Sequence, residues 1–336
     1  MNENKGVVWL YTLITALIAG ISSAFYAILV KYYYEADTGM FKVGFETPDA
    51  FSVFVAVGLL TLLVSVLIMS KDGLPKEMRA VPFLTTTVAI FAAFVLIFSS
   101  VQFLTGNTSD IIGSASAVQK IRKIGAFAGF LAACYYFLLL FVGKTKNKTI
   151  AFMSFFPLIW TWIYLLGVYF DHSSEMSSPI RVIKELALIS LMLYQLMETR
   201  ALVGKAKPRA YILISGIAVM FLSPAFLIDA YDYLWLGESL KLDALHVIYG
   251  ALMAIYIFSR MIGFALGCGE KRVKIKKHRK GDIFTEEEDV PEQENKPTGV
   301  AEFFEEVKEE PAVQEQEESE TVETAEVQEQ NEQREI

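Results

Sequence analysis

The chain has 336 residues, of which 54% are hydrophobic and 20% are charged, and its mean hydropathy is +0.40. Soluble domains are about 45–50% apolar and intersperse their polar residues. Here residues 1–280 carry 27 Lys and Arg against 17 Asp and Glu, whereas residues 281–336 carry 3 against 21. This segregation excludes a soluble globular enzyme and predicts a membrane protein with an acidic tail.

Long apolar runs recur through the first 268 residues. A helix needs about 20 mostly apolar residues to cross the hydrocarbon layer, and it pairs its backbone amides internally. The runs that meet this requirement are 7–30, 51–69, 81–104, 124–142, 150–170, 182–203, 210–230 and 245–266. The sequence therefore predicts an all-α membrane protein, a bundle of about eight transmembrane helices. The first run is too long for an ordinary cleaved signal peptide, so we expect it to be retained.

Lys and Arg are distributed unevenly between the two sides that eight crossings would define. With the N-terminus inside, the inner segments carry 18 Lys and Arg and the outer loops carry 8. Cytoplasmic loops are enriched in these residues, so both termini are predicted to lie in the cytoplasm, at the cell membrane. The exception is loop 105–123, which places Lys120, Arg122 and Lys123 on the outer side. That cluster indicates an interfacial helix or a misplaced third or fourth span.

A basic juxtamembrane segment, 269–280, follows the last run. Its cations, within Lys271–Lys280, are suited to the lipid bilayer surface, where anionic headgroups attract such residues. A simpler interpretation is a positive anchor that stops translocation. We expect no nucleic-acid binding from so short a run beside a membrane.

The acidic tail, 281–336, has too little apolar surface to fold and is predicted to be disordered. Within it Val300, Phe303, Phe304 and Val307 follow helical spacing and would form one apolar face. Such a face can dock in a groove of a cytosolic protein partner. The alternative is a transient helix that binds nothing.

Ionisable residues inside a span are costly and are candidates for function. Glu198 and Arg260 have matching depths near the inner ends of their runs, so they can pair, although Arg260 can also snorkel to the surface. Glu185, Asp229 and His246 come to one level near the outer face. They suggest a cation or proton site, or else side chains wetted by the headgroup layer.

Motifs of common enzymes are missing from the sequence. It contains no His-Glu-x-x-His, no Cys-x-x-Cys, no Gly-x-Ser-x-Gly elbow and no phosphate-binding loop. We therefore expect no catalytic residues, no metal and no cofactor, and we expect that the protein is not an enzyme.

One stretch resembles a known group. Residues 175–185 (EMSSPIRVIKE), continuing through 186–196, Glu198, Arg200 and loop 204–209, resemble a family of uncharacterised bacterial multi-pass integral membrane proteins. Residues 34–41 after the first run are similar to the same group. The resemblance covers about the first 265 residues, and Glu198 and Arg200 are the charged pair that carries it. It implies a bacterial cytoplasmic membrane and an all-helical bundle. It implies no activity.

Two functions remain open from the sequence. The first is a non-enzymatic multi-pass membrane protein whose cytoplasmic tail recruits a partner. The alternative is a secondary transporter or ion-coupled carrier. The outer group of Glu185, Asp229 and His246 motivates it, together with Pro224, which should interrupt a helix in mid-span.

Overall fold

The structure is a computed structural model. It describes residues 3–35, 38–42, 47–69, 83–105, 116–141, 148–170, 178–203, 205, 207–231 and 244–267. All of these belong to one compact unit, Met1–Val273. The predicted basic segment, 269–280, and acidic tail, 281–336, lie outside the described residues, and so does the docking face of Val300, Phe303, Phe304 and Val307.

Helices account for nearly all of the described chain. The elements, in order, are α1 (Glu3–Tyr33), a short hairpin of β1 (Tyr34–Glu35) and β2 (Met40–Phe41), α2 (Thr47–Ile68), α3 (Phe83–Leu104), α4 (Ser116–Phe141), α5 (Lys148–Met153), α6 (Phe155–Tyr169), α7 (Pro179–Leu202), α8 (Pro208–Leu222), the π-helical turn η1 (Ser223–Leu227), α9 (Ile228–Tyr231) and α10 (Ala244–Gly267). In the hairpin, Tyr34 pairs with Phe41 and Glu35 with Met40, antiparallel.

Each of the eight predicted runs is helical, but not all eight are shown to be spans. Among the described residues, six helical segments are long and apolar enough to cross a membrane: Gly6–Tyr33, Thr47–Ile68, Phe83–Gln102, Thr149–Tyr169, Pro208–Tyr231 and Leu245–Leu266. In α4 the apolar part is shorter, Lys123–Leu139. Helix α7 carries charged residues near both ends and is not among the six.

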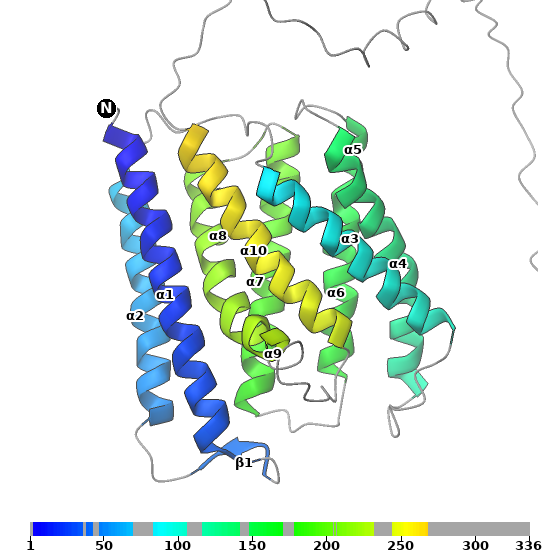
Figure 1. The fold of residues 1–336 in the computed structure, drawn as a ribbon, viewed down its shortest axis with the longest axis horizontal. Coiled ribbons are helices and arrows are strands. Elements are labelled where there is room, and N and C mark those ends of the chain that lie inside the picture. The colour runs from blue at the N-terminus through cyan, green and yellow to red at the C-terminus, as the bar shows by residue number, and fades with distance from the viewer. Residues whose placement is uncertain are drawn as a thin grey trace, which may run out of the picture. The chain divides into compact units, whose positions relative to one another are not determined.

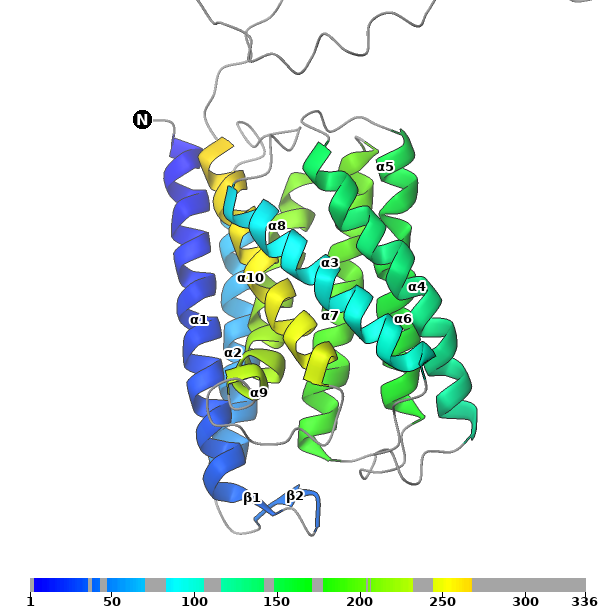
Figure 2. The same ribbon diagram turned by 45° about the vertical axis from the view of Figure 1, so that its right-hand side comes forward.

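The helices form a bundle with α10 near its centre. Helix α10 packs against α3, α8 and α1, while α4 joins α3 to α6 and α7 joins α6 to α8. Both views show α1 and α2 together along one edge and α4 near the other (Figure 1, Figure 2). Two thirds of the apolar window is buried in α10 and in α8–α9, against 22% in α2. Helices α8 and α10 therefore build the interior, and α2 covers a side.

Two prolines explain where helices are interrupted. Pro224 has no N–H to donate to a carbonyl one turn earlier, and a π-helical turn, Ser223–Leu227, is found at that position. The hydroxyl of Ser223 donates to the carbonyl of Val219 at 2.7 Å. Pro157 lies in the first turn of α6, and the break from α5 comes at Ser154. The interruption that the sequence predicted at Pro224 is thus confirmed.

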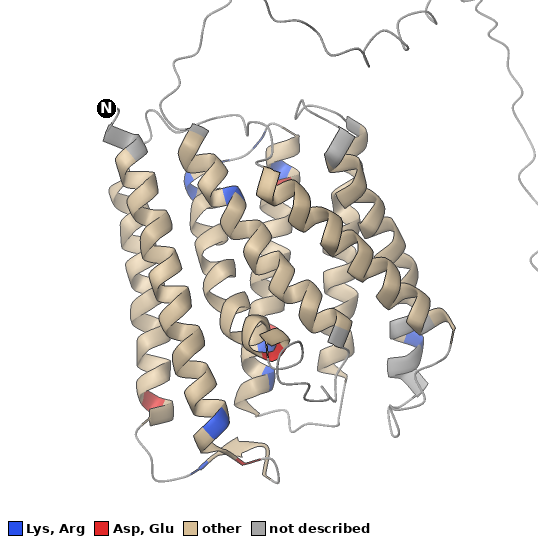
Figure 3. Cartoon of the chain, viewed as in Figure 1, with Lys and Arg blue, Asp and Glu red and all other residues tan. Residues whose placement is uncertain are grey.

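The outside of the bundle is apolar along its length. Large side chains are well exposed, among them Leu13, Leu17, Leu67 and Phe98, each above 60%. The charged residues of the described helices gather toward the two ends, and the part between them is almost free of charge (Figure 3). A soluble protein rarely exposes so large an apolar surface, so this distribution is typical of helices surrounded by hydrocarbon.

The start of α4 corrects the predicted loop at 105–123. Helix α4 begins at Ser116, eight residues before the predicted span at 124. Lys120 is therefore on the first turns of a helix, ahead of its apolar part. The basic cluster is a charged extension of α4, which accounts for its place outside the apolar run.

Candidate functional site: a charge pair and a polar stripe inside the bundle

The charges of Glu198 and Arg260 meet in the interior. The Nε atom of Arg260 lies 3.5 Å from Oε1 of Glu198, and the two side chains are only 5% and 4% exposed. Glu198 belongs to the buried face of α7, which repeats at helical spacing through Leu191, Tyr194 and Leu202. The pairing considered from the sequence is found in the structure, and Arg260 does not snorkel to the surface.

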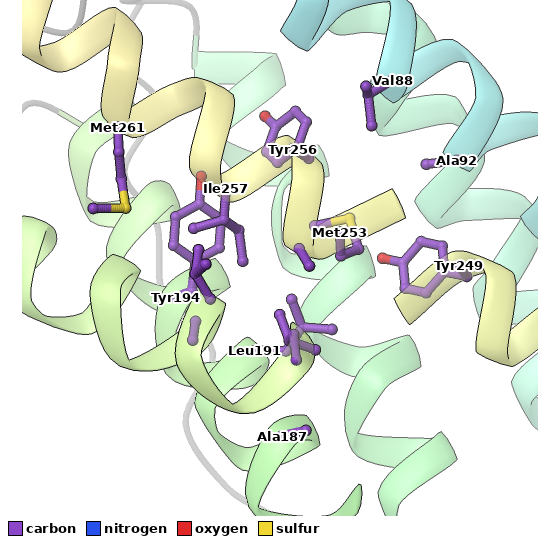
Figure 4. Packing of buried hydrophobic residues seen from close by; sticks show 14 of the residues in the cluster. Val88, Ala92, Ala187, Leu191, Tyr194, Tyr249, Met253, Tyr256, Ile257 and Met261 are labelled. Atoms are coloured by element: carbon purple, nitrogen blue, oxygen red, sulfur yellow. The ribbon is translucent and has the colours of Figure 1, made fainter. Parts of the chain in front are cut away.

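Tyrosines surround this pair. The hydroxyl of Tyr256 donates to Oε1 of Glu198 at 2.7 Å. One turn earlier on α7, the hydroxyl of Tyr194 lies 3.1 Å from that of Tyr211 on α8, and both tyrosines are electrostatic neighbours of the charges. Tyr194 reaches from α7 toward α10, where it lies beside Ile257 (Figure 4). Helices α7, α8 and α10 thus each contribute a polar group next to the pair.

Polar and soft side chains continue along one face of α10. His246, Tyr249, Met253, Tyr256 and Arg260 are all buried and are spaced by three or four residues, which puts them on one side of the helix. We call these five residues the α10 stripe. At 1.5 Å per residue the stripe extends about 21 Å, a large part of the roughly 30 Å hydrocarbon layer.

Neighbouring helices connect the members of the α10 stripe. The hydroxyl of Tyr136 on α4 is 2.9 Å from that of Tyr249 and also donates to the sulfur of Met253 at 3.2 Å. Its ring lies 6.0 Å from the ring of Tyr256. Tyr136 therefore bridges the middle of the stripe to the end that holds the charge pair.

The other end of the α10 stripe is an aromatic stack. The ring of His246 lies 4.5 Å from Tyr164 and 5.4 Å from Trp160, nearly parallel to both. Its Nε2 is 3.2 Å from the hydroxyl of Ser99. The ring of Trp160 also contacts Tyr249, with centroids 4.6 Å apart. The stack joins His246 to the next member of the stripe.

Two buried hydroxyl groups beside the stripe, those of Tyr135 and Ser100, have no hydrogen-bond partner among the described residues. The amide of Gln195 interacts with the hydroxyl of Tyr249. Gln195 lies one turn before Glu198 on the buried face of α7. Buried polar groups are nearly always paired with protein or water. We therefore expect water or a polar ligand next to the middle of the stripe.

The outer acids predicted from the sequence have cations of their own. Lys184 lies 2.8 Å from Asp229, joining α7 to α9, and Arg181 lies 2.9 Å from Glu185 along α7. Arg181 also donates to the carbonyl of Tyr169. Glu185 and Asp229 are thus neutralised separately, while His246 belongs to the aromatic stack of α6 and α10 and contacts Ser99 of α3.

In the described part of the chain, no group of three or more His, Cys, Asp or Glu side chains comes together. Comparisons with protein-family models, with curated proteins and with solved structures found no match for this chain.

The tyrosines were the part of the site that sequence reasoning missed. Their signal is the spacing 246, 249, 253, 256, 260 within a single apolar run. A row of polar and aromatic residues on one face of an otherwise apolar helix marks the face that turns away from lipid.

Proposed function

We propose that the chain crosses a cytoplasmic membrane eight times, with both termini in the cytoplasm. The two helices outside the six apolar candidates, α4 and α7, each pack between candidates. The charges of α7 lie toward its ends and leave residues 186–197 uncharged. The excess of Lys and Arg in the inner segments over the outer loops supports this orientation.

We further propose that the bundle is a secondary carrier that uses the proton as its coupling ion. The observation that carries this proposal is the α10 stripe, which leads from His246 to the buried pair of Glu198 and Arg260. A purely structural pair would be expected to have satisfied neighbours, because a partly satisfied polar network is destabilising. Here the buried hydroxyl of Tyr135 has no hydrogen-bond partner among the described residues.

The pair has two electrostatic states that a carrier can use. In the ionised state Glu198 holds Arg260 and accepts the hydrogen bond from Tyr256. When the carboxylate takes up a proton, its attraction for the guanidinium is lost, whereas the guanidinium stays charged. The guanidinium, no longer held by the carboxylate of Glu198, then binds an anionic solute, and loss of the proton restores the pair and releases the solute.

The test is proton movement in liposomes that contain the purified protein and a pH-sensitive dye inside. A gradient of lactate, succinate or citrate is imposed, and acidification is followed with time. We expect solute-dependent proton entry for the wild type and none for Glu198→Gln. Lys184→Met, which breaks the outer ion pair, is the matched control and should keep the activity. Wild-type rates equal to those of protein-free liposomes, or undiminished rates in a folded Glu198→Gln variant, would refute the proposal.

A second function is proposed for the tail, because the charge and composition of the chain change so abruptly at residue 281. The tail recruits a cytosolic protein through Val300, Phe303, Phe304 and Val307, and Lys271–Lys280 binds anionic lipid headgroups. Proximity labelling from the C-terminus should lose its main labelled protein in Phe303→Ala/Phe304→Ala but keep it in Val313→Ala/Val322→Ala. Identical labelling in the two variants would contradict recruitment through this face.

A further inference from the structure

A groove opens on the side of the bundle, away from the α10 stripe. It is lined by α1, α2, α7, α8, η1 and Phe41 of the hairpin, and its volume is about 400 Å³. That volume falls within the usual range for ligand pockets, about 300–1,000 Å³. Val182 and Leu186 form part of the lining on α7 and are about 40% exposed, so the groove is open at the surface between α2 and α7.

Most of the lining is apolar, so the groove is suited to an apolar ligand. Phe51, Val55, Ile183, Met220 and Phe221 contribute side chains to it. The surface outside is also apolar, and α1 and α2 are both candidate membrane spans. In a bilayer the apolar part of such a crevice is accessible to hydrocarbon chains.

Three polar side chains line the groove, and because Ser52 donates its hydroxyl to the carbonyl of Pro48, Ser22 and Asp49 are left to contact a ligand. The hydroxyl of Ser22 is buried, with the residue 1% exposed, and has no hydrogen-bond partner among the described residues. The carboxylate of Asp49, in the first turn of α2, is exposed, and no Lys or Arg of the described chain pairs with it. The groove thus offers a hydrogen-bond donor deep inside and a negative charge toward the end of the helix.

The depth of these two groups follows from the register of α1 and α2. The ring of Phe51 lies 5.4 Å from Phe25 and 6.1 Å from Tyr26, so Asp49 is level with the turn of α1 just beyond Tyr26. Ser22 is about six residues away from that level toward the middle of α1. At 1.5 Å per residue the hydroxyl lies about 9 Å deeper than the carboxylate.

We propose that this groove is a binding site for one membrane phospholipid with an amine headgroup. One acyl chain fills the apolar part, an ester carbonyl accepts the hydrogen bond from Ser22, and the headgroup ammonium pairs with Asp49. The two polar contacts match the order of groups along such a lipid, with the ammonium outermost and the ester closer to the chains. A lipid with an uncharged or only anionic headgroup leaves the carboxylate of Asp49 unpaired.

Lipid retention in nanodiscs tests the site directly. The protein is placed in nanodiscs with equal amounts of phosphatidylethanolamine and phosphatidylglycerol, released into the mass spectrometer, and scored for the lipid that stays bound. We expect one retained phosphatidylethanolamine per chain. Asp49→Asn should lower the preference for it about tenfold, because it removes a charged hydrogen-bonding partner. Ser22→Ala should weaken retention of both lipids severalfold.

A steric variant provides the control for folding. Val182→Trp places an indole at the rim of the groove and should abolish specific retention. Leu193→Trp makes the same change at an exposed position of α7 outside the groove and should leave retention unchanged. Equal retention of the two lipids by the wild type, or retention unaffected by Val182→Trp, would overturn the proposal. Displacement of the lipid by tetraphenylphosphonium, with Ser22→Ala behaving as wild type, would also overturn it and assign the groove to a lipophilic cation.

Discussion

Removing one member of the buried charge pair should destabilise the bundle, and the two members should differ in their effect. Glu198→Gln leaves the guanidinium of Arg260 buried without a countercharge, and this group cannot lose its proton. Arg260→Met leaves a carboxylate that keeps the hydrogen bond from Tyr256 and that can be neutralised by a proton. We therefore expect Glu198→Gln to be the more damaging change.

The magnitude follows from the separation and burial of the two groups. At 3.5 Å, with an effective dielectric constant of about 20, the attraction is about 5 kcal/mol before desolvation is counted. Breaking a buried pair on one side usually costs about 3–5 kcal/mol, whereas replacing both members by neutral groups costs much less. We expect about 3–5 kcal/mol for Glu198→Gln, about 2–3 kcal/mol for Arg260→Met, and a double variant far more stable than the sum of the two losses.

The assay is equilibrium unfolding of the purified protein in mixed micelles, followed by near-UV circular dichroism from the buried tyrosines. Folding of Arg260→Met with a neutral Glu198 takes up a proton, so its deficit should shrink as the pH falls from about 8 to about 5. The deficit of Glu198→Gln should not shrink in this way. Losses below about 1 kcal/mol for Glu198→Gln, or losses that simply add in the double variant, would refute this reasoning.

Three further changes test packing and electrostatics by the same unfolding measurement. In Gly250→Ala the added carbon meets the ring of Phe226 in the π-helical turn, so we expect a loss of about 1–3 kcal/mol, whereas Gly20→Ala has open space and should be neutral or slightly stabilising. Lys184→Met removes a partly exposed ion pair and should cost less than about 1 kcal/mol, and a loss above about 2 kcal/mol would contradict its surface character. His246→Phe keeps the aromatic stack but loses the bond to Ser99, so it should cost about 1 kcal/mol, clearly less than His246→Ala.

The helices could be predicted from the sequence because apolar runs of this length have few alternatives in lipid. All eight runs are helical, and the first, 7–30, lies within Glu3–Tyr33. The start of α4 was placed too late because charged residues were assigned to the loop, although a helix can extend beyond its apolar part. An apolar run alone does not locate the break at Ser154, three residues before Pro157. Hydropathy also cannot separate a span from a helix such as α7, whose charges are compensated within the helix and by α9 and α10.

The candidate site was predictable only in part. Matching depths in two runs brought Glu198 and Arg260 together correctly, since both lie near the inner ends of their helices. Depth alone also grouped Asp229 with His246, but it carries no information on which way each helix faces. The buried tyrosines of the site, such as Tyr256, carry no charge and were not singled out from the sequence. The side of each helix that faces the interior depends on tertiary packing, which the sequence pattern does not determine.

The charge pair has a consequence for how the protein is made. Glu198 leaves the ribosome about 60 residues before Arg260, which at about 5–20 residues per second is an interval of several seconds. During that time α7 carries an acid whose countercharge has not yet been synthesised, so only a proton can neutralise it until α10 is made. A chain truncated before α10 would therefore keep Glu198 without its arginine and should be less stable than the complete bundle.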